Sequence, residues 1–306
     1  MSTAMASGAA ARPRPTLSTW VMAFRPKTLS AAVAPVLVGT ALAYASGHGR
    51  ALPALAALVG ALLIQIGTNL TNDYYDFKKG ADTAERLGPK RVTQSGLIAP
   101  DTVLRAAVLA FALAMAVGVY LVAIAGWPIL VAGVLSVLCG YAYTGGPYPL
   151  GYHGLGDLFV FVFFGLVAVG GTYFVQAGAL AAPALVAAVP IGALGTAILA
   201  VNNLRDVSTD EKAGKRTLVV RLGVPAGRAE YVAMLGLAFI TPLVFWVAGW
   251  ARAPVLLGWL ALPAAVPPLR RVLREGGAAL NPALGETARL QLVFAVLFSV
   301  GLLLGR

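Results

Sequence analysis

Two short segments place asparagine and aspartate in the same pattern at the ends of long apolar runs. The first spans 69–76 and reads NLTNDYYD, the second spans 202–210 and reads NNLRDVSTD, and both contain Asn-x-x-x-Asp. Spacings of three and four put the aspartates of each segment on one helix face. Carboxylates beside a membrane span are costly unless they meet counter-ions, which marks them as functional. Two facing acidic pairs could hold Mg²⁺, because this ion takes oxygen ligands and often bridges to substrate phosphates. These candidate catalytic residues and metal ligands are Asp73, Asp76, Asp206 and Asp210.

Each acidic segment is followed by a Lys-Arg pair, at 90–91 and at 215–216. Carboxylates for Mg²⁺ together with Lys and Arg for phosphate oxygens are suited to binding a diphosphate. The alternative is that these are ordinary solvated charges at a membrane interface. Asn69 and Asn202 argue against it, because each lies a turn deeper in an apolar run, where polar groups need partners.

The composition indicates a protein that crosses a membrane several times. The chain has 306 residues, of which 59% are apolar and only 11% charged, with a mean hydropathy of +0.81. A soluble domain carries roughly 25% charged residues. The net charge of +11 would favour a nucleic-acid partner only if the basic residues clustered on a soluble face. They lie in loops between apolar runs instead, which is typical of membrane topology. We therefore expect a lipid bilayer around the chain and no nucleic acid.

Apolar stretches of about 17–25 residues are the signal for membrane-spanning helices. The sequence predicts nine of them, and so an all-α membrane protein with a single helical bundle over 20–306. Residues 1–19 are small, polar and proline-containing, and predict a disordered tail. The nine predicted spans are 28–47, 51–71, 103–124, 127–143, 157–179, 182–204, 230–250, 253–269 and 288–305.

The distribution of basic residues predicts the orientation. With the N-terminus inside, 20 of the 23 Lys and Arg residues fall on the cytoplasmic side, and only Arg50, Arg252 and Arg306 fall outside. Such a bias is expected of a correct span assignment. It predicts a multi-pass protein of the plasma or inner membrane, with the N-terminus in the cytoplasm, the C-terminus outside, and both acidic segments facing the cytoplasm.

A weak internal repeat relates the second and sixth predicted spans. Both run in the same direction, end in Asn-x-x-x-Asp, and are followed by an acidic loop and a Lys-Arg pair close to a threonine. Repeats of this kind imply a pseudo-two-fold axis along the membrane normal, with the site between the halves. We therefore expect the Asp-rich loops to form a cap on the cytoplasmic side of the bundle.

A diphosphate site at the mouth of an apolar bundle favours a lipid diphosphate as the ligand. Metal and cations would stabilise charge on a departing diphosphate, and aromatic faces could stabilise an allylic carbocation. A membrane transporter is a rival class, but the ionisable residues gather at one face and leave no polar path across. A glycosyltransferase using a prenyl phosphate is another, but no polar loop here is large enough for a nucleotide-sugar domain.

With these motifs and nine spans, residues 20–305 resemble the UbiA superfamily of intramembrane prenyltransferases. Finer features resemble its 1,4-dihydroxy-2-naphthoate prenyltransferase branch, which makes demethylmenaquinone. The branches acting on 4-hydroxybenzoate or haem usually carry a basic pair after the turn that follows the fourth helix, whereas this chain has Gly145-Gly146-Pro147 there. The segments that carry the resemblance to the naphthoate branch are RPKT at 25–28, NLTNDYYD at 69–76, KGAD at 79–82, GPKRV at 88–92, YTGGPYPL at 143–150 and GKRTL at 214–218.

The resemblance implies a reaction and a site. A polyprenyl group would pass from an allylic polyprenyl diphosphate to 1,4-dihydroxy-2-naphthoate with loss of CO₂, in menaquinone biosynthesis. Asp73 and Asp76 would hold one Mg²⁺, and Asp206 with Asp210 another. No strong general base is expected, since the dihydroxy ring supplies the electron push. The nearest rival is the same chemistry with another acceptor or a phytyl donor. The resemblance implies no particular isoprenoid length or oligomeric state. The implied substrate-binding residues are Asn69, Asn72, Asp82, Lys90, Arg91, Tyr143, Asn202, Lys215 and Arg216.

Overall fold

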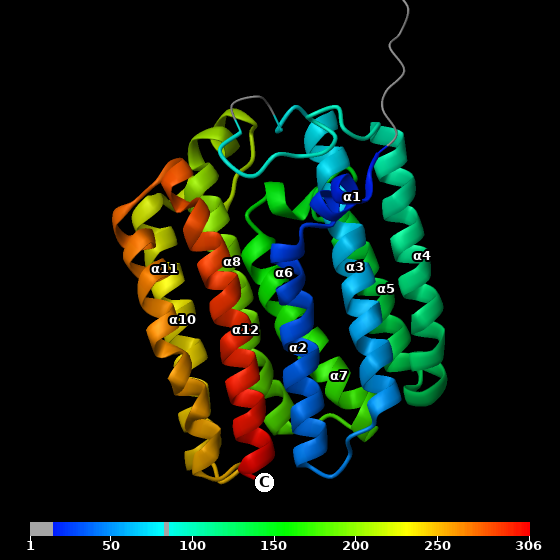
Figure 1. The fold of residues 1–306 in the computed structure, drawn as a ribbon, viewed down its shortest axis with the longest axis vertical. Coiled ribbons are helices and arrows are strands. Elements are labelled where there is room, and N and C mark those ends of the chain that lie inside the picture. Colours follow the sequence, from blue (N-terminus) through cyan, green and yellow to red (C-terminus); the bar gives the residue numbers. More distant parts are fainter. Residues whose placement is uncertain (1–14, 83–85) are drawn as a thin grey trace, which may run out of the picture.

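Long apolar helices make up most of the computed structural model, which describes residues 15–82 and 86–306. They run side by side along one long axis (Figure 1). In chain order the helices are α1 (Leu17–Phe24), α2 (Pro26–Ala45), α3 (Ala51–Lys78), α4 (Pro100–Ala125), α5 (Trp127–Ala142), α6 (Gly156–Val160), α7 (Ala168–Ala177), α8 (Ala182–Lys212), α9 (Leu218–Leu222), α10 (Val224–Val247), α11 (Leu262–Arg274) and α12 (Asn281–Leu304). The shorter helical segments are η1 (Leu150–Tyr152), the π-helix η2 (Phe161–Val167), η3 (Ala253–Ala261) and η4 (Gly277–Leu280).

Each of the nine predicted spans corresponds to a helix, but they are not all equally long. Within the described residues, eight helices are long and apolar enough to cross a membrane. They include continuous segments built from α6, η2 and α7 (Gly156–Ala177), and from η3 and α11 (Ala253–Arg274). The remaining predicted span is α5, which is apolar but has only 16 residues. Its start is fixed by Gly126, whose φ of 81° ends α4, and by a proline in the first turn of α5.

Several predicted boundaries are wrong, and α12, for example, begins at Asn281, seven residues before its predicted start. Helices α3 and α8 continue past residues 71 and 204 and end at Lys78 and Lys212, so both acidic segments are helical and do not lie in loops. The tail boundary is also wrong, because α1 begins at Leu17, before residue 19. Residues 1–14 of the predicted tail lie outside the part that the structure describes.

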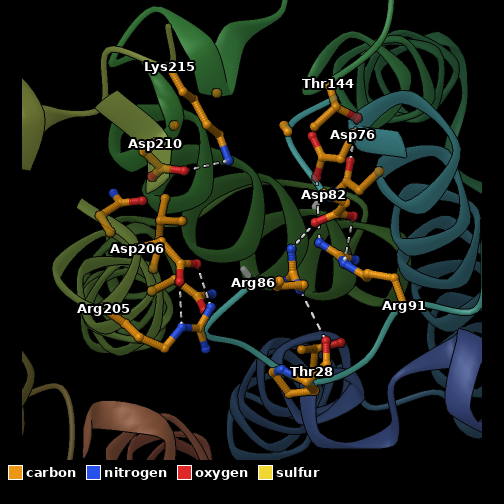
Figure 2. A pocket seen from close by; sticks show the side chains of 18 of the residues that line it. Thr28, Asp76, Asp82, Arg86, Arg91, Thr144, Arg205, Asp206, Asp210 and Lys215 are labelled. Atoms are coloured by element: carbon orange, nitrogen blue, oxygen red, sulfur yellow. Dashed lines mark hydrogen bonds and ion pairs between the residues drawn. The ribbon is translucent and has the colours of Figure 1, made fainter. Parts of the chain in front are cut away.

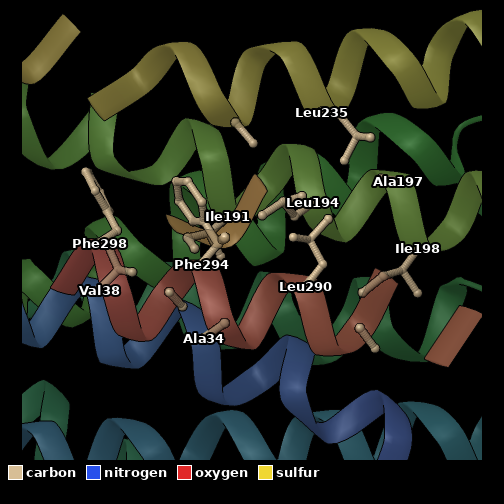
Figure 3. Close-up of a cluster of buried hydrophobic side chains, with 14 of the residues drawn as sticks. Ala34, Val38, Ile191, Leu194, Ala197, Ile198, Leu235, Leu290, Phe294 and Phe298 are labelled. Atoms are coloured by element: carbon tan, nitrogen blue, oxygen red, sulfur yellow. The ribbon is translucent and has the colours of Figure 1, made fainter. Parts of the chain in front are cut away.

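The core of the bundle is centred on α8. Its most apolar window is 78% buried inside the protein, more than that of any other described span. Ile191 and Leu194 of α8 belong to one buried cluster with Leu290, Phe294 and Phe298 of α12 (Figure 3). Burial of such side chains is the dominant favourable term in packing one element against another in water. In a bilayer, close van der Waals contact replaces it.

Small residues let α8 approach the π-helix η2. A Cβ atom added to Gly192 would lie 2.7 Å from the carbonyl oxygen of Phe161, and one added to Gly165 would lie 2.9 Å from the carbonyl oxygen of Ala188. Such contacts are typical of helix pairs in membranes, where small residues let backbones meet. They fix the start of the Gly156–Ala177 segment against α8.

The outer surface of the bundle is apolar. Val108, Val119 and Val247 are 60%, 69% and 75% exposed, respectively. Soluble monomers rarely present broad apolar surface, whereas lipid tails are a suitable neighbour for it. Both acidic segments lie at one end of the bundle, and the C-terminus lies at the other end (Figure 1).

Candidate active site

A cavity of about 350 Å³ opens between the ends of α3 and α8. Its size falls within the range of ligand pockets, roughly 300–1,000 Å³. Most of the residues predicted from the sequence meet there, although they come from segments far apart in the chain. Those lining the cavity are Asn72, Asp76, Asp82, Lys90, Arg91, Tyr143, Asn202, Asp206, Asp210 and Lys215. Asn69, Asp73 and Arg216 are not among its lining residues.

One wall of the cavity comes from α3 and the loop after it (Figure 2). The carboxylate of Asp76 accepts a hydrogen bond from Tyr152 Oη at 2.9 Å and one from Arg91 Nη2 at 3.5 Å. Arg91 Nε also lies 3.3 Å from the carboxylate of Asp82, which Arg86 contacts as well. Burial raises the pKa of Asp82 to about 6, although the cation of Arg86 opposes the shift. This wall therefore interleaves carboxylates with guanidinium groups.

The opposite wall comes from the end of α8 (Figure 2). Arg205 makes a two-pronged contact with its neighbour Asp206, at 2.8 Å from Nε and 2.5 Å from Nη2. Asn281 of α12 accepts a further hydrogen bond from Arg205 Nη1 at 3.2 Å. Asp210 pairs with Lys215, whose Nζ lies 3.6 Å away. Burial disfavours the charged lysine, but nearby carboxylates, including Asp210, outweigh it and raise the pKa of Lys215.

Two residues of the first motif face away from the cavity. The buried carboxylate of Asp73 accepts hydrogen bonds from the backbone N–H groups of Val92 at 3.3 Å and Thr93 at 3.4 Å. Asn69 Nδ2 donates to the carbonyl oxygen of Phe24 and to Thr28 Oγ1, both at 3.0 Å. These side chains hold the loop after α3 and the junction of α1 with α2 against the bundle.

Only one member of the second basic pair lines the cavity. The backbone N–H of Arg216 donates to the carbonyl oxygen of Tyr152 at 2.9 Å, and its own carbonyl accepts from Arg221 Nε at 3.1 Å. The neighbouring Lys215 lines the cavity. The Lys-Arg repeat therefore supplies cations to the cavity from 90–91 but a single one from 215–216.

Arg25 is a site residue that the sequence interpretation did not assign. It lines the cavity and joins α1 to α2 in a left-handed conformation with a φ of 53°, rare for a residue other than glycine. Its guanidinium donates to the carbonyl oxygen of Asn69 at 3.1 Å. Burial lowers the pKa of Arg25, and the carboxylate of Asp73 opposes this. The signal in the sequence was Pro26, because the residue before a proline avoids the helical region and a helix break follows.

Asp157, Asn203 and Arg205 also line the cavity, and none of the three was predicted. Tyr152 holds the carboxylate of Asp76. Asp157 was placed as the first residue of the predicted span 157–179. The sequence did contain a signal for Asp157. A carboxylate at the start of an apolar run is costly unless it has a function, which is the argument that singled out the two acidic segments. Burial and the carboxylate of Asp76 raise the pKa of Tyr152, which keeps its phenol protonated as the donor to Asp76.

The carboxylates of the cavity are of the type that Mg²⁺ prefers. In the described ranges, 15–82 and 86–306, no group of three His, Cys, Asp or Glu side chains converges on one point. Four of the carboxylates that line the cavity form two groups instead. Asp76 and Asp82 lie on one wall, Asp206 and Asp210 on the other, and each of the four contacts an Arg or Lys side chain. Mg²⁺ is usually bound by one or two carboxylates plus waters and substrate phosphates. The donor set therefore fits a metal that arrives with a diphosphate.

A bundle of membrane-length helices with a cavity of mixed charge at one end indicates a multi-pass integral membrane protein. The chain belongs to the UbiA prenyltransferase family, whose model matches residues 32–303.

Several proteins of known name are similar along most of the chain. The 1,4-dihydroxy-2-naphthoate octaprenyltransferase of Escherichia coli (strain K12) is 39% identical over 297 residues, which cover 94% of this chain and 96% of the relative. The protein of the same name from Mycobacterium tuberculosis is 39% identical, with 94% and 97% covered. The human UbiA prenyltransferase domain-containing protein 1 is 32% identical, with 94% and 84% covered.

Solved structures share the fold. A UbiA homolog from Aeropyrum pernix K1 superposes with a TM-score of 0.67 at 14% identity, covering 89% of this chain and 97% of the other. A UbiA homolog from Archaeoglobus fulgidus, bound to GPP and Mg²⁺, gives a TM-score of 0.61 at 16% identity, with 92% and 99% covered.

Proposed function

We propose that this chain transfers a polyprenyl group from an allylic polyprenyl diphosphate to 1,4-dihydroxy-2-naphthoate, with loss of CO₂, to give demethylmenaquinone for menaquinone biosynthesis. The observation that carries the proposal is the cavity, where two groups of carboxylates and several cations meet at the end of an apolar bundle. That site belongs to a chain that is 39% identical to proteins named for this transfer over 94% of its length. Transfer to another aromatic acceptor, or from a phytyl donor, is the alternative within the family.

Arg91 is the residue best placed to bind the diphosphate. It is 8% exposed and lines the cavity. Its Nη1 atom is buried and has no hydrogen-bond partner among the described residues. A buried donor of this kind costs free energy until an acceptor arrives. A diphosphate oxygen would satisfy it, and Lys90 and Lys215 would add charge from either side of the cavity.

Asp76 and Asp82 on one wall, and Asp206 and Asp210 on the other, would hold Mg²⁺ together with the diphosphate. The metal would supply stabilisation of the negative charge that develops as the diphosphate departs. Asp73, predicted as a metal ligand, would act indirectly. Its carboxylate accepts a hydrogen bond from the backbone N–H of Val92 and so fixes the loop that carries Arg91.

The remaining polar residues would orient the substrates. Asn72 accepts a hydrogen bond from Thr144 Oγ1 at 2.7 Å, and Lys79 Nζ donates to the carbonyl oxygen of Thr144 at 2.6 Å. These contacts fix the turn after α5, next to Tyr143. Asn202 lines the cavity from α8. Positioning of this kind can supply much of a rate enhancement, since reacting atoms must be held within about 3–3.5 Å.

We infer a nine-helix topology with the N-terminus and the active site facing the cytoplasm, in the plasma or inner membrane. Two facts support it: the bias of Lys and Arg and the position of both acidic segments at one end of the bundle (Figure 1). Helix α5 would be the ninth membrane span. Because it is short, it would cross where the bilayer is locally thin or stand nearly parallel to the membrane normal. The matching ends of α3 and α8 support the pseudo-two-fold repeat, with the acidic residues and loops as the cytoplasmic cap.

The test is a transfer assay with the purified chain in liposomes. It contains Mg²⁺, an allylic polyprenyl diphosphate and 1,4-dihydroxy-2-naphthoate labelled in its carboxylate. The expected result is labelled CO₂ together with a prenylated naphthoquinone, both abolished by EDTA. Diphosphate release without CO₂ would point to another acceptor, to be sought among 4-hydroxybenzoate and homogentisate. No reaction with any allylic donor, in folded protein, would overturn the proposal and favour a transporter.

A further inference from the structure

Asp157 is a cavity carboxylate that the two motifs do not include. It lies in the first turn of the Gly156–Ala177 segment, is 9% exposed and lines the same cavity as the paired aspartates. A π-helix begins four residues further on, at Phe161. Such irregular turns are frequent at functional sites, and a carboxylate at this depth is costly unless it has a task.

The surroundings of Asp157 differ from those of the other cavity carboxylates. Asp76, Asp82, Asp206 and Asp210 each pair with an Arg or Lys side chain. Asp157 has no such ion pair among the residues that the structure describes. Its partner is neutral: Asn203 Nδ2 donates to Asp157 Oδ1 at 3.4 Å.

The side chains next to Gly156, the residue before Asp157, are aromatic and apolar. A Cβ atom added to Gly156 would lie 2.8 Å from Tyr143 Oη and 3.2 Å from Leu199 Cδ2. Both residues line the cavity. Burial and the carboxylate of Asp157 raise the pKa of Tyr143, so the phenol stays protonated as a donor. This corner therefore offers flat, apolar contact together with one carboxylate.

The cavity is thus divided by charge. The corner at Asp157 repels a diphosphate, because its negative charge has no cation to offset it, and the walls with Arg91 and Lys215 attract one. A neutral ring hydroxyl suits the corner, because a carboxylate accepts a strong hydrogen bond from it. The two substrates of the proposed reaction differ in this respect. The donor ends in a diphosphate with several negative charges, whereas the acceptor carries two ring hydroxyls and a single carboxylate, so a hydroxyl can face Asp157 while the carboxylate points toward the cations.

We propose that Asp157 binds the acceptor hydroxyl next to the attacked ring carbon and takes its proton during the transfer. This inference rests on the proposed function. It departs from the expectation that no general base is needed. It also assigns the acceptor to the side of the cavity formed by Asp157, Asn203 and Tyr143.

Asp157 takes the hydroxyl proton in the first step and gives it back to the same oxygen in the last. As the hydroxyl proton passes to Asp157, the ring carbon that bears the carboxylate forms a bond to the allylic C1. The bond from C1 to the diphosphate breaks, and the diphosphate leaves with the electron pair. The former hydroxyl is now a ketone beside the carboxylate. Loss of CO₂ returns the electrons of the C–C bond to that oxygen, which takes the proton back from Asp157. The direct product of this step is the prenylated hydroquinone, so atoms and charges balance without an oxidant or a further co-reactant. Oxidation of this hydroquinone by air during work-up gives the prenylated naphthoquinone that the assay detects.

The test compares Asp157→Asn with wild type in the transfer assay. The amide keeps the shape but cannot accept a proton, so we expect kcat to fall by roughly 100-fold or more, the range for general acid–base catalysis. The KM for the allylic diphosphate should change by less than about threefold, since binding of the donor is unaffected. Asp101→Asn, at an exposed aspartate in the first turn of α4, is the matched control and should retain wild-type kinetics. Asp157→Glu restores the acid and should recover part of kcat.

A binding measurement separates contact from a merely structural role. Wild type should bind 1,4-dihydroxy-2-naphthoate more tightly than its 1-methoxy ether by about tenfold, equivalent to a hydrogen bond to a charged group. Asp157→Asn should bind the two about equally. Asp157→Ser serves the same comparison should the amide variant not fold.

Transfer by wild type together with an unchanged kcat in Asp157→Asn would overturn the inference and leave the proposed function intact. A preference for the free hydroxyl that persists in the variant would do the same. Absence of transfer to the naphthoate by folded wild type would instead remove the proposed function, and the assignment of Asp157 with it.

Discussion

The ends of α3 and α8 carry the same sequence motif in two different environments. On α8, Asp206 and Asp210 both line the cavity. On α3, Asp76 lines it while Asp73, three residues earlier, faces the backbone of the following loop. Residues three apart on a helix lie on the same side but point in somewhat different directions. Here the edge of the cavity falls between the directions of Asp73 and Asp76. An Asn-x-x-x-Asp pattern therefore predicts where carboxylates gather, but not which ones meet the ligand.

The partners of the two ends differ as well. The α3 end is held by a long loop through backbone hydrogen bonds and by Arg91, which contacts both Asp76 and Asp82. The α8 end is held by its own neighbour Arg205 and by Lys215, five residues beyond Asp210. The first end depends on tertiary contacts, whereas the second is largely local. Loss of a carboxylate should therefore have different consequences at the two ends.

The largest effect is expected at the α8 end. Asp210→Asn should lower kcat by roughly 100-fold or more, since it removes one of the carboxylates that would hold Mg²⁺ against the departing diphosphate. The melting temperature should change little. The amide removes the cost of burying a charged carboxylate, and Lys215 keeps Asp76 and Asp206 as nearby carboxylates. The CO₂-release assay and a thermal melt in detergent measure the two quantities. Glu211→Gln, at the exposed neighbour, removes the same charge outside the cavity and should be silent. Activity loss in both variants would argue for a general effect of charge.

Arg91 tests the wall of the cavity that is formed by α3 and the loop after it. Arg91→Ala should raise the KM for the allylic diphosphate by about 10-fold or more, because hydrogen bonds to charged groups contribute about 1.5–3 kcal/mol. The KM for the acceptor should rise much less. Arg105→Ala, at an exposed arginine of α4, is the control. Equal increases in both KM values would contradict the assignment of Arg91 to the diphosphate.

Asp73 tests whether the two ends differ as the structure indicates. Asp73→Asn replaces an acceptor of two backbone N–H groups with an amide that presents one acceptor and one donor. The variant should lose about 1–3 kcal/mol of stability, and its melting temperature should fall, unlike that of Asp210→Asn. An unchanged melting temperature together with lost turnover would show that Asp73 acts as a metal ligand after all, and that the two ends are equivalent.

The smallest effect is expected where the two walls touch. A Cβ atom added to Gly88 would lie 2.9 Å from Arg205 Nη2 and 3.1 Å from its Cζ. Gly88→Ala should push Arg205 off its preferred rotamer at a cost of about 0.5–1.5 kcal/mol. We expect the KM for the diphosphate to rise roughly twofold to tenfold, consistent with that cost. Gly276→Ala, where an added Cβ meets nothing within 4 Å, is the control. An unaffected Gly88→Ala variant would mean that Arg205 does not couple the walls.

Much of the architecture could be predicted because membrane helices carry their signal locally. A run of apolar residues needs no distant partner to be helical in a bilayer, since every backbone group must be satisfied within the segment. The nine predicted spans therefore coincide with helices, although α5 is short for a span. The ends of α3 and α8 were missed because polar residues continue a helix as readily as they start a loop.

The site residues also fall into two groups, those predictable from the local sequence and those placed by tertiary contacts. The motifs placed ten of the thirteen predicted residues at the cavity, since spacing on a helix end and charge are properties of the sequence. Asn69, Asp73 and Arg216 do not line the cavity. Their contacts come from α1, the loop at 92–93 and η1, which no spacing reveals. Arg25 and Asp157 were missed because each is a single charged residue whose partners lie far along the chain.

The sequence alone determined that this protein is a helical membrane protein of the UbiA type with two acidic segments at one face, because hydropathy, charge bias and short motifs are written in consecutive residues. The tertiary structure decided which carboxylates face the cavity and that Arg91 presents an unsatisfied donor there. It also decided that Asp157 pairs with Asn203 and forms no ion pair among the described residues. These properties depend on where α3, α8 and the Gly156–Ala177 segment meet. That meeting is set by close packing at positions such as Gly165 and Gly192.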